Sequence, residues 1–216
     1  MTGYKRNQIE EAISAVLMPR SQGPTSELRT RVKRLLETDR ALGRIPRSVD
    51  PERANYAFYS AESPGSGVEV WFSEYEGFGL LMGLRLMGHG WPQGFAVSVM
   101  RRVRLELEKQ HARILKQDPT TLFDQEAIRR NVREGDMVFN NTDPVLLAIV
   151  SKSGLTPNEQ REPQACGVCR GAREAMQFAW GVGKGTGAWT MFELVNVAHD
   201  LSKALVRTEP RHRGPS

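Results

Sequence analysis

The centre of the chain constrains the fold most, because it contains a predicted helix with no polar face to present to solvent. Ser73 and Glu76 have the S-x-x-E spacing of a capping box, which marks the start of a helix. Residues 74–87 are apolar around almost the whole circumference of that helix, and Gly88 ends it. A helix that is hydrophobic all round is buried, so we expect this one to lie in the core. Gly79 and Gly83, four residues apart, leave a smooth strip where another backbone can approach closely.

A second, longer helix is predicted to follow, from Pro92 in its first turn to about Lys116. Apolar residues and one histidine mark its inner side at helical spacing: Phe95, Val99, Val103, Leu107, His111 and Ile114. The basic residues of this helix lie elsewhere around it: Arg101, Arg102, Arg104, Lys109, Arg113 and Lys116. A long amphipathic helix of this kind often pairs, so it is the predicted contact of a homodimer.

The turn Gly-His-Gly-Trp-Pro joins the two helices and raises the question of a catalytic His89. A general base needs an orienting carboxylate and a nucleophile within reach, and no neighbouring residue clearly supplies them. The glycines end one helix, Trp91 can pack and Pro92 restarts the next. We interpret the turn as a helix corner.

The N-terminal region is predicted to be a pair of helices. Ile9, Ala12, Ile13, Val16 and Leu17 have amphipathic spacing, and that helix should end at Met18, before Pro19. Thr25 or Ser26 can cap a second helix that Gly43 stops. Five basic residues lie on the faces opposite its apolar stripe: Arg29, Arg31, Lys33, Arg34 and Arg40.

Positive charge is concentrated in this N-terminal segment. Between Lys5 and Arg47 there are ten Lys or Arg against five Asp or Glu, an excess of five that equals the formal net charge of +5 of the whole chain. Such asymmetry favours a polyanionic partner, and Lys5 and Arg6 at the start of the first helix could contact a phosphate. The alternative is a basic helix that is merely solvated.

The remaining segments are predicted to be strands, short helices and loops. "YAFYS" and "VEVWF" would form a hairpin around "AESPGSG", and residues 121–136 a short helix. "MVFNN", "PVLLAIVS" and "EAMQFAWGV" are predicted strands, with a final helix from about Trp189 to Leu205. The fold class is therefore α+β. We expect a basic helical pair at 1–53, a hairpin with two helices at 54–118, a small α+β region at 119–207 and a disordered tail at 208–216.

Three other motifs suggest chemistry. Cys166 and Cys169 form a CxxC, which is half of a zinc site, a redox pair or simply two structural cysteines. "GVGKGTG" resembles the end of a phosphate-binding loop, but Phe178 and Gly185 stand where a glycine and a magnesium-binding hydroxyl belong, so we reject a nucleotide site. "FNNTDP", with Asp136 nearby, is better explained as a turn than as a cation site, and no cofactor is expected.

Nothing in the sequence indicates a membrane segment. No window approaches the roughly 18 consecutive apolar residues of a spanning helix, and the polar start is unlike a secretory signal. A cytoplasmic protein with no membrane partner is predicted.

The order of elements resembles the MerR-like winged helix-turn-helix regulators over residues 4–116. "YKRNQIEEAI" resembles the opening of the family's first helix, "YAFYS…VEVWF" takes the place of its wing, and "LRLMG" resembles its L-R-x-x-G corner. The resemblance implies double-stranded DNA as a partner.

These patterns together predict a bacterial or phage-type DNA-binding transcription regulator, not an enzyme, with a C-terminal region that senses a ligand or binds a partner. Lys5, Arg6, Arg29, Arg31, Lys33, Arg34 and Arg40 would contact the DNA. Two alternatives remain: an interaction protein that docks its basic helix on an acidic partner, and a metal or redox sensor built on the cysteine pair.

Overall fold

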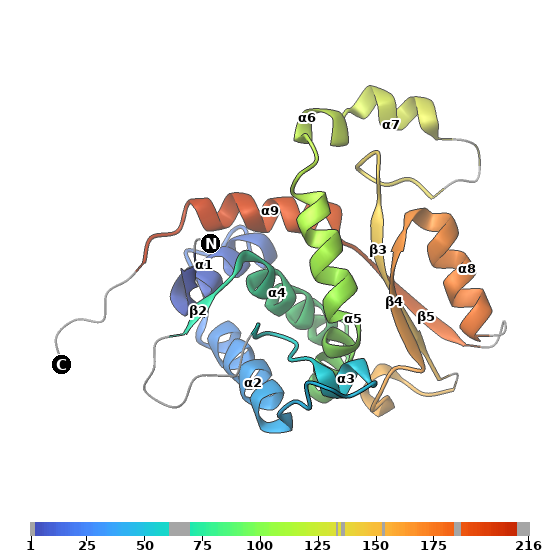
Figure 1. Ribbon diagram of the computed structural model, residues 1–216. Helices are drawn as coiled ribbons and strands as arrows, with labels where there is room; N and C mark the ends of the chain where they lie inside the picture. The colour runs from blue at the N-terminus through green and yellow to red at the C-terminus, as the bar shows by residue number, and fades with distance from the viewer. Residues whose placement is uncertain are drawn as a thin grey trace. The chain divides into compact units, whose positions relative to one another are not determined.

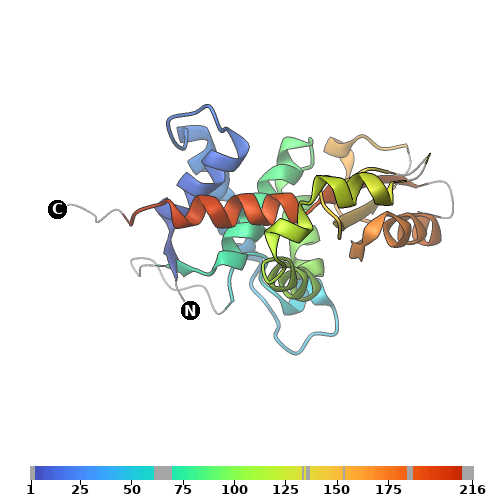
Figure 2. The same ribbon diagram turned by 90° about the horizontal axis from the view of Figure 1, so that it is seen from above.

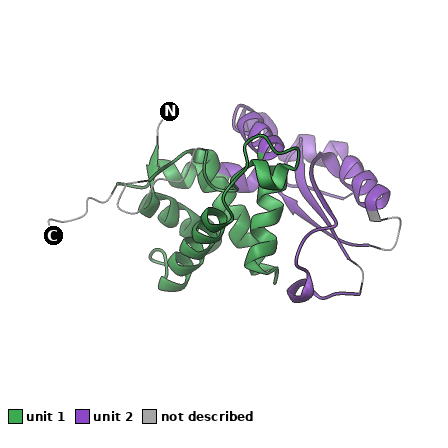
Figure 3. Cartoon of the chain, turned by 60° about the horizontal axis from the view of Figure 1, so that its bottom comes forward, with its two compact units in different colours: residues 1–104, 200–216 green, residues 105–199 purple. Residues whose placement is uncertain are grey.

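The computed structural model describes residues 3–60, 70–132, 134, 137–152, 154–183 and 187–210. These residues form helices and two antiparallel sheets joined by turns and loops, which confirms the α+β class (Figure 1). The chain divides into two compact units (Figure 3). Unit 1 comprises residues 1–104 and 200–216, and unit 2 comprises residues 105–199.

Unit 1 is mainly helical. Its helices before the corner are α1 (Arg6–Leu17), α2 (Ser26–Leu42), α3 (Pro51–Ala54) and α4 (Glu74–Gly88). The first, second and fourth were predicted from the sequence, whereas the single turn of α3 was not. Thr25 caps α2 by accepting a hydrogen bond from the backbone N–H of Leu28, and Gly43 ends it at φ +59°.

The buried helix α4 forms the core of unit 1, as predicted. Its capping box is complete: the Ser73 hydroxyl accepts from the Glu76 N–H, and the Ser73 N–H donates to the Glu76 carboxylate. A methyl group added at Gly83 would lie 3.1 Å from the Phe58 ring and 3.3 Å from Leu35. One added at Gly79 would lie 3.5 Å from the Ala57 carbonyl oxygen. The glycine strip therefore accommodates the segment around Phe58.

The predicted hairpin is wrong over the described residues. Residues 56–60 form no strand, and β2 (Trp71–Phe72) pairs instead with β1 (Tyr4–Lys5) in antiparallel register. The reason is a competing hydrogen-bond acceptor: the Asp39 carboxylate binds the amides of Ala57 and Phe58, within a segment whose residues Tyr56 to Tyr59 all lie in the core. Residues 61–69, which include the expected hairpin loop, lie outside the described part.

The corner leads into the long helix α5 (Gln93–Ile114), which contributes residues to both units. Trp91 is buried and stacks on Phe95, with 4.3 Å between the ring centroids. Gly90 has φ +90°, a conformation that favours glycine. All six residues predicted for the inner side of α5 are buried, so the periodicity identified that side correctly.

Unit 2 contains a three-stranded antiparallel sheet in the order β4-β3-β5. Its elements are α6 (Pro119–Leu122), α7 (Gln125–Asn131), β3 (Val145–Ser151), a 3-10 turn (Pro157–Glu159), β4 (Ala165–Arg170), α8 (Gly171–Gly183) and β5 (Ala188–Glu193). Every residue of β3 is buried. Leu146 and Ala148 of that strand pack with Cys169 and Ala175 in a hydrophobic cluster.

Three sequence predictions for unit 2 are wrong. Residues 137–141 form no strand, and "EAMQFAWGV" belongs to the helix α8, whose Ala175 and Ala179 are buried one turn apart. The predicted helix from Trp189 begins only at Val195, because residues 188–193 pair with β3 as β5. The helix α9 (Val195–Val206) contributes residues to both units and can be followed in Figure 2.

Candidate nucleic-acid interface

The five basic side chains of α2 are all exposed. The helix is held in unit 1 by its opposite side, where Leu28, Val32, Leu35 and Leu36 are buried. An N-capped helix with a packed stripe presents its outer side chains from a fixed backbone. This geometry makes the outer surface of α2 available to a partner.

The exposed basic residues do not form a single row. Arg29, Lys33 and Arg40 are four and seven residues apart and therefore lie on one side of α2, while Arg31 and Arg34 lie further round the helix. The basic charge is thus distributed over a broad surface. Such a surface suits contacts to several phosphates better than a single bidentate contact.

Carboxylates accompany several of these cations. Arg31 Nη2 lies 2.6 Å from Glu27 Oε1, and Lys33 Nζ lies 3.6 Å from Glu37 Oε1, both within one turn of α2. All four side chains are at least 44% exposed, and exposed pairs of this kind are typically worth less than about 1 kcal/mol. A phosphate could therefore replace either carboxylate at little cost.

Lys5 and Arg6 are more constrained than the residues of α2. The Lys5 ammonium lies 5.3 Å from the centre of the Trp71 ring. The Arg6 guanidinium donates to Glu10 at 2.7 Å and to the backbone carbonyl of Arg29 at 3.2 Å. Arg6 therefore links α1 to α2, and these bonds restrict the directions from which its guanidinium could reach a phosphate.

The two units carry different charge. Unit 1 contains nineteen Lys or Arg and thirteen Asp or Glu, a formal charge of +6, whereas unit 2 contains eleven and twelve, a formal charge of −1. The excess of positive charge in the N-terminal segment is therefore also an excess of positive charge in unit 1 as a whole. Charge of one sign on one unit attracts polyanions over a range of about 8–10 Å at physiological salt.

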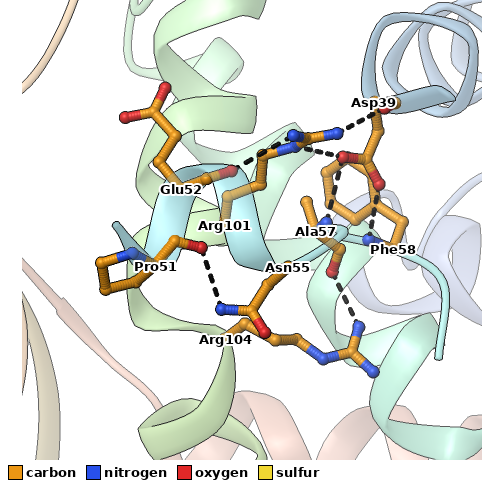
Figure 4. Close-up of polar contacts among 8 residues, drawn as sticks. All are labelled: Asp39, Pro51, Glu52, Asn55, Ala57, Phe58, Arg101 and Arg104. Carbon is orange, nitrogen blue, oxygen red and sulfur yellow. Dashed lines mark hydrogen bonds and ion pairs between the residues drawn. The ribbon is translucent and has the colours of Figure 1, made fainter. Parts of the chain in front are cut away.

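Arg101 and Arg104, which the periodicity placed away from the inner side of α5, are buried, and Figure 4 shows their polar contacts. Arg101 Nε lies 2.6 Å from Asp39 Oδ1 at the end of α2, and the Asp39 carboxylate also accepts the N–H groups of Ala57 and Phe58, each at 3.0 Å. Arg104 donates to the Ala57 carbonyl at 3.0 Å. These arginines hold the fold together and are not available to a ligand.

The sequence did not indicate two basic residues that share a cleft of unit 1 with the start of α2. Lys203 and Arg207 of the C-terminal segment line the same cleft as Arg29. They are about 175 residues away from it in the chain, and no local pattern connects them. Only the tertiary structure could have identified them.

The CxxC pair lies in the strand β4, which changes its chemistry. Side chains alternate between the two faces of a strand, so Cys166 and Cys169, three residues apart, point to opposite faces. Cys169 is 2% exposed, and burial, assisted by the charge of Glu174, raises the pKa of its thiol to about 11. The two sulfur atoms are therefore not adjacent in the strand β4.

The remaining motifs take structural positions. His89 is exposed and forms the C-cap of α4, where its N–H donates to the Arg85 carbonyl. Asn141 donates to Glu193, and Asp143 accepts from Arg113 and Gln117, so the two oxygen-rich residues of "FNNTDP" bind protein groups. Asp136 and residues 184–186 of the glycine-rich turn lie outside the described residues.

Unit 2 also contains a buried histidine pair. His111 and His199 are both buried, and the ring of His199 packs edge-on against Phe123, with 5.3 Å between the centroids. Burial, with a smaller contribution from the charge of His199, lowers the pKa of His111 to about 4. Within the described ranges, no group of three or more His, Cys, Asp or Glu side chains is placed to hold a metal ion.

Comparison with known proteins identifies no relative of this chain, so a functional conclusion has to be based on the geometry described above. The chain matches no family model, no curated protein and no solved structure. Among the described residues, the helices are all too short or too polar to cross a membrane.

Proposed function

We propose that this protein is a DNA-binding regulatory protein, with its interface on the outer surface of α2 in unit 1. The observation that carries the proposal is the exposure of all five basic residues of α2 within a unit of formal charge +6. Electrostatic attraction to phosphates supplies most of the affinity of non-specific DNA binding.

Arginine suits this role because its planar guanidinium can bind a phosphate through two parallel hydrogen bonds. Arg29, Lys33 and Arg40 on one side of α2 would contact one stretch of backbone. Arg34 and Arg31 lie further round the helix and would reach phosphates or base edges beyond it.

The proposal keeps the resemblance to MerR-like regulators for the first helix and the helix corner, but not for the wing, because residues 56–60 form no strand. In its support, α1 follows directly after Tyr4 and Lys5, and the L-R-x-x-G motif ends α4 at the corner before α5. Unit 2 would sense a ligand or bind a partner. Pairing of two copies through α5 would have to use its outer side, where Leu105 is 69% exposed, because the inner side is already buried.

The test is fluorescence anisotropy of a labelled generic duplex across a salt series. The first variant replaces Arg29, Arg31, Lys33 and Arg34 by Ala. A matched control removes four exposed arginines of unit 2, and so the same charge, by replacing Arg129, Arg130, Arg161 and Arg173 with Ala. Circular dichroism would establish that both variants remain folded.

We expect the wild type to bind with an affinity that falls steeply with salt. Each phosphate contact contributes about 0.9 to the slope of log K against log salt concentration, so the α2 variant should lose up to about 3.6 of that slope. The unit 2 control should retain the wild-type slope. Absence of binding by the wild type at low salt would refute the proposal, and equal losses in both variants would refute α2 as the interface. Binding to polyglutamate but not to the duplex would favour an acidic protein partner.

A further inference from the structure

Unit 1 contains a cleft of about 930 Å³ that the proposed interface does not explain. It is bounded by one side of α1, the connection at residues 19–24, the start of α2 and the C-terminal half of α9, which can be followed in Figure 1. Its lining includes five charged residues and a buried serine: Glu11, Arg29, Asp200, Lys203, Arg207 and Ser14. Its volume falls within the range of about 300–1,000 Å³ that is typical of small-molecule sites.

Three cations from two distant parts of the chain meet at this cleft. Arg29 enters from α2, and its Nε lies 3.8 Å from Oε2 of Glu10. Lys203 and Arg207 are exposed and come from the end of α9. No ion pair to the Arg207 guanidinium is found among the residues that the structure describes. A side chain in this position is available to a ligand.

The lining of the cleft includes a buried residue whose polar group lacks a hydrogen-bond partner. Ser14 is 1% exposed, and its hydroxyl has no hydrogen-bond partner among the described residues. A buried hydroxyl without a partner is unfavourable, so native structures seldom retain one without water or a ligand nearby. This observation is independent of the three cations of the cleft.

We propose that this cleft binds a small phosphomonoester that also carries hydroxyl groups. A phosphomonoester has a charge of about −1.5 to −2 at pH 7 and several acceptor oxygens, which matches three cations better than a single carboxylate does. The carboxylates of Glu11 and Asp200 would accept hydrogen bonds from the hydroxyl groups of the ligand. Three cations and these two carboxylates give the lining a formal charge of +1, which suits one phosphate group with hydroxyl groups better than a continuous phosphate backbone.

The cleft would also regulate DNA binding, an inference that rests on the proposed function. Arg29 belongs both to the cleft and to the basic surface of α2. A phosphate bound in the cleft would occupy its guanidinium and so lower the affinity for DNA. The cleft would then be an effector site within the DNA-binding unit itself.

The direct test is isothermal titration calorimetry of the full chain with AMP, and with adenosine as the matched probe that lacks the phosphate. We expect AMP to bind and adenosine to bind at least about tenfold more weakly. Arg207→Ala should weaken AMP binding by about tenfold or more, since it removes a charge-assisted hydrogen bond. Arg40→Ala, which removes an exposed arginine of α2 outside the cleft, should leave AMP binding unchanged.

The outcomes separate this proposal from the proposed function. Binding of AMP that Arg207→Ala weakens would support the cleft, even if no duplex binds. Equal binding of AMP and adenosine, or equal effects of Arg207→Ala and Arg40→Ala, would overturn it. Loss of duplex affinity in Arg207→Ala with no AMP binding would also overturn it, and would assign the cleft to the DNA surface. The regulatory inference predicts that AMP raises the duplex Kd of the wild type but not of Arg207→Ala.

Discussion

The buried pair of Asp39 and Arg101 allows the most demanding test of how this fold is held together. Asp39 is fully buried and its carboxylate accepts three hydrogen bonds: one from Arg101 and two from the backbone at Ala57 and Phe58. Asp39→Ala would leave a buried guanidinium without its counter-ion and two amides without their acceptor. We expect the free energy of unfolding to fall substantially.

The magnitude follows from the contacts. Removing one partner of a buried ion pair costs about 3–5 kcal/mol, and each unsatisfied amide would add about 1 kcal/mol. Arg101 keeps its bonds to the backbone carbonyls of Asp39, at 2.5 Å, and Glu52, at 3.2 Å, which reduces the loss. The expected destabilisation of Asp39→Ala is therefore about 4 kcal/mol, a large part of the typical stability of a domain.

Urea unfolding followed by circular dichroism measures this loss, with Glu37→Ala as a control. Glu37 lies on the same helix, and its side chain is 56% exposed, so its removal should cost less than about 0.5 kcal/mol. If Asp39→Ala does not fold, Asp39→Asn keeps the size and one acceptor oxygen and gives a smaller, measurable loss. Native-state hydrogen exchange should show faster exchange at the amides of Ala57 and Phe58.

A double-mutant cycle tests the ion pair itself. Arg101→Met removes the uncompensated charge, so Asp39→Ala with Arg101→Met should be less destabilised than the sum of the two single variants. A loss below about 1 kcal/mol in Asp39→Ala, or strict additivity in the cycle, would refute the reasoning. A small loss would mean that the Asp39 carboxylate contributes little to holding residues 56–60, and additivity would mean that Asp39 and Arg101 do not stabilise each other.

Three further predictions concern the histidine, glycine and cysteine positions. The pKa of His111 is about 4 in the folded state against 6.5 when unfolded, so the unfolded chain binds a proton first as the pH falls. Protonation of His111 in the unfolded chain should thus lower the free energy of unfolding by about 3 kcal/mol between pH 6.5 and 4. Urea unfolding at a series of pH values measures this loss as the difference between the wild type and His111→Gln. Parallel pH dependence of the two proteins would contradict the prediction. Gly83→Ala should cost about 1–2 kcal/mol by crowding Phe58 and Leu35, whereas Gly94→Ala, with no atom within 4 Å of the added methyl, should be neutral or stabilising in thermal unfolding. At pH 8 the Cys169 thiol stays protonated and buried, so Ellman's reagent should modify at most Cys166 until the protein is unfolded, and two reactive thiols in the native state would disprove this.

The helices α1, α2 and α4 and the long α5 could be predicted because their signals are local. The Thr25 cap, the capping box at Ser73 and the apolar spacing of each helix lie within a few residues of one another along the chain. The helix corner at His89 was predictable for the same reason. These features need no knowledge of distant neighbours.

The errors arose where local patterns are ambiguous. "EAMQFAWGV" contains the bulky residues that strands favour, and only the packing of Ala175 and Ala179 shows it to be a helix. The segment at residues 56–60 is rich in aromatic residues, as a strand often is, but a carboxylate from α2 takes the hydrogen bonds of two of its amides. Short aromatic or apolar runs do not distinguish strand from buried loop or helix without their neighbours.

The sequence alone determined the positions of α1, α2, α4 and α5, the buried character of α4 and the concentration of positive charge near the N-terminus. These depend on periodicity, caps and composition, which are properties of neighbouring residues. The tertiary structure decided the rest: it buried Arg101 and Arg104, placed the cysteines on opposite faces of a strand and brought Arg207 to the cleft beside Arg29. The physical reason is that burial and charge pairing depend on residues far apart in the chain, and only the folded backbone brings them together.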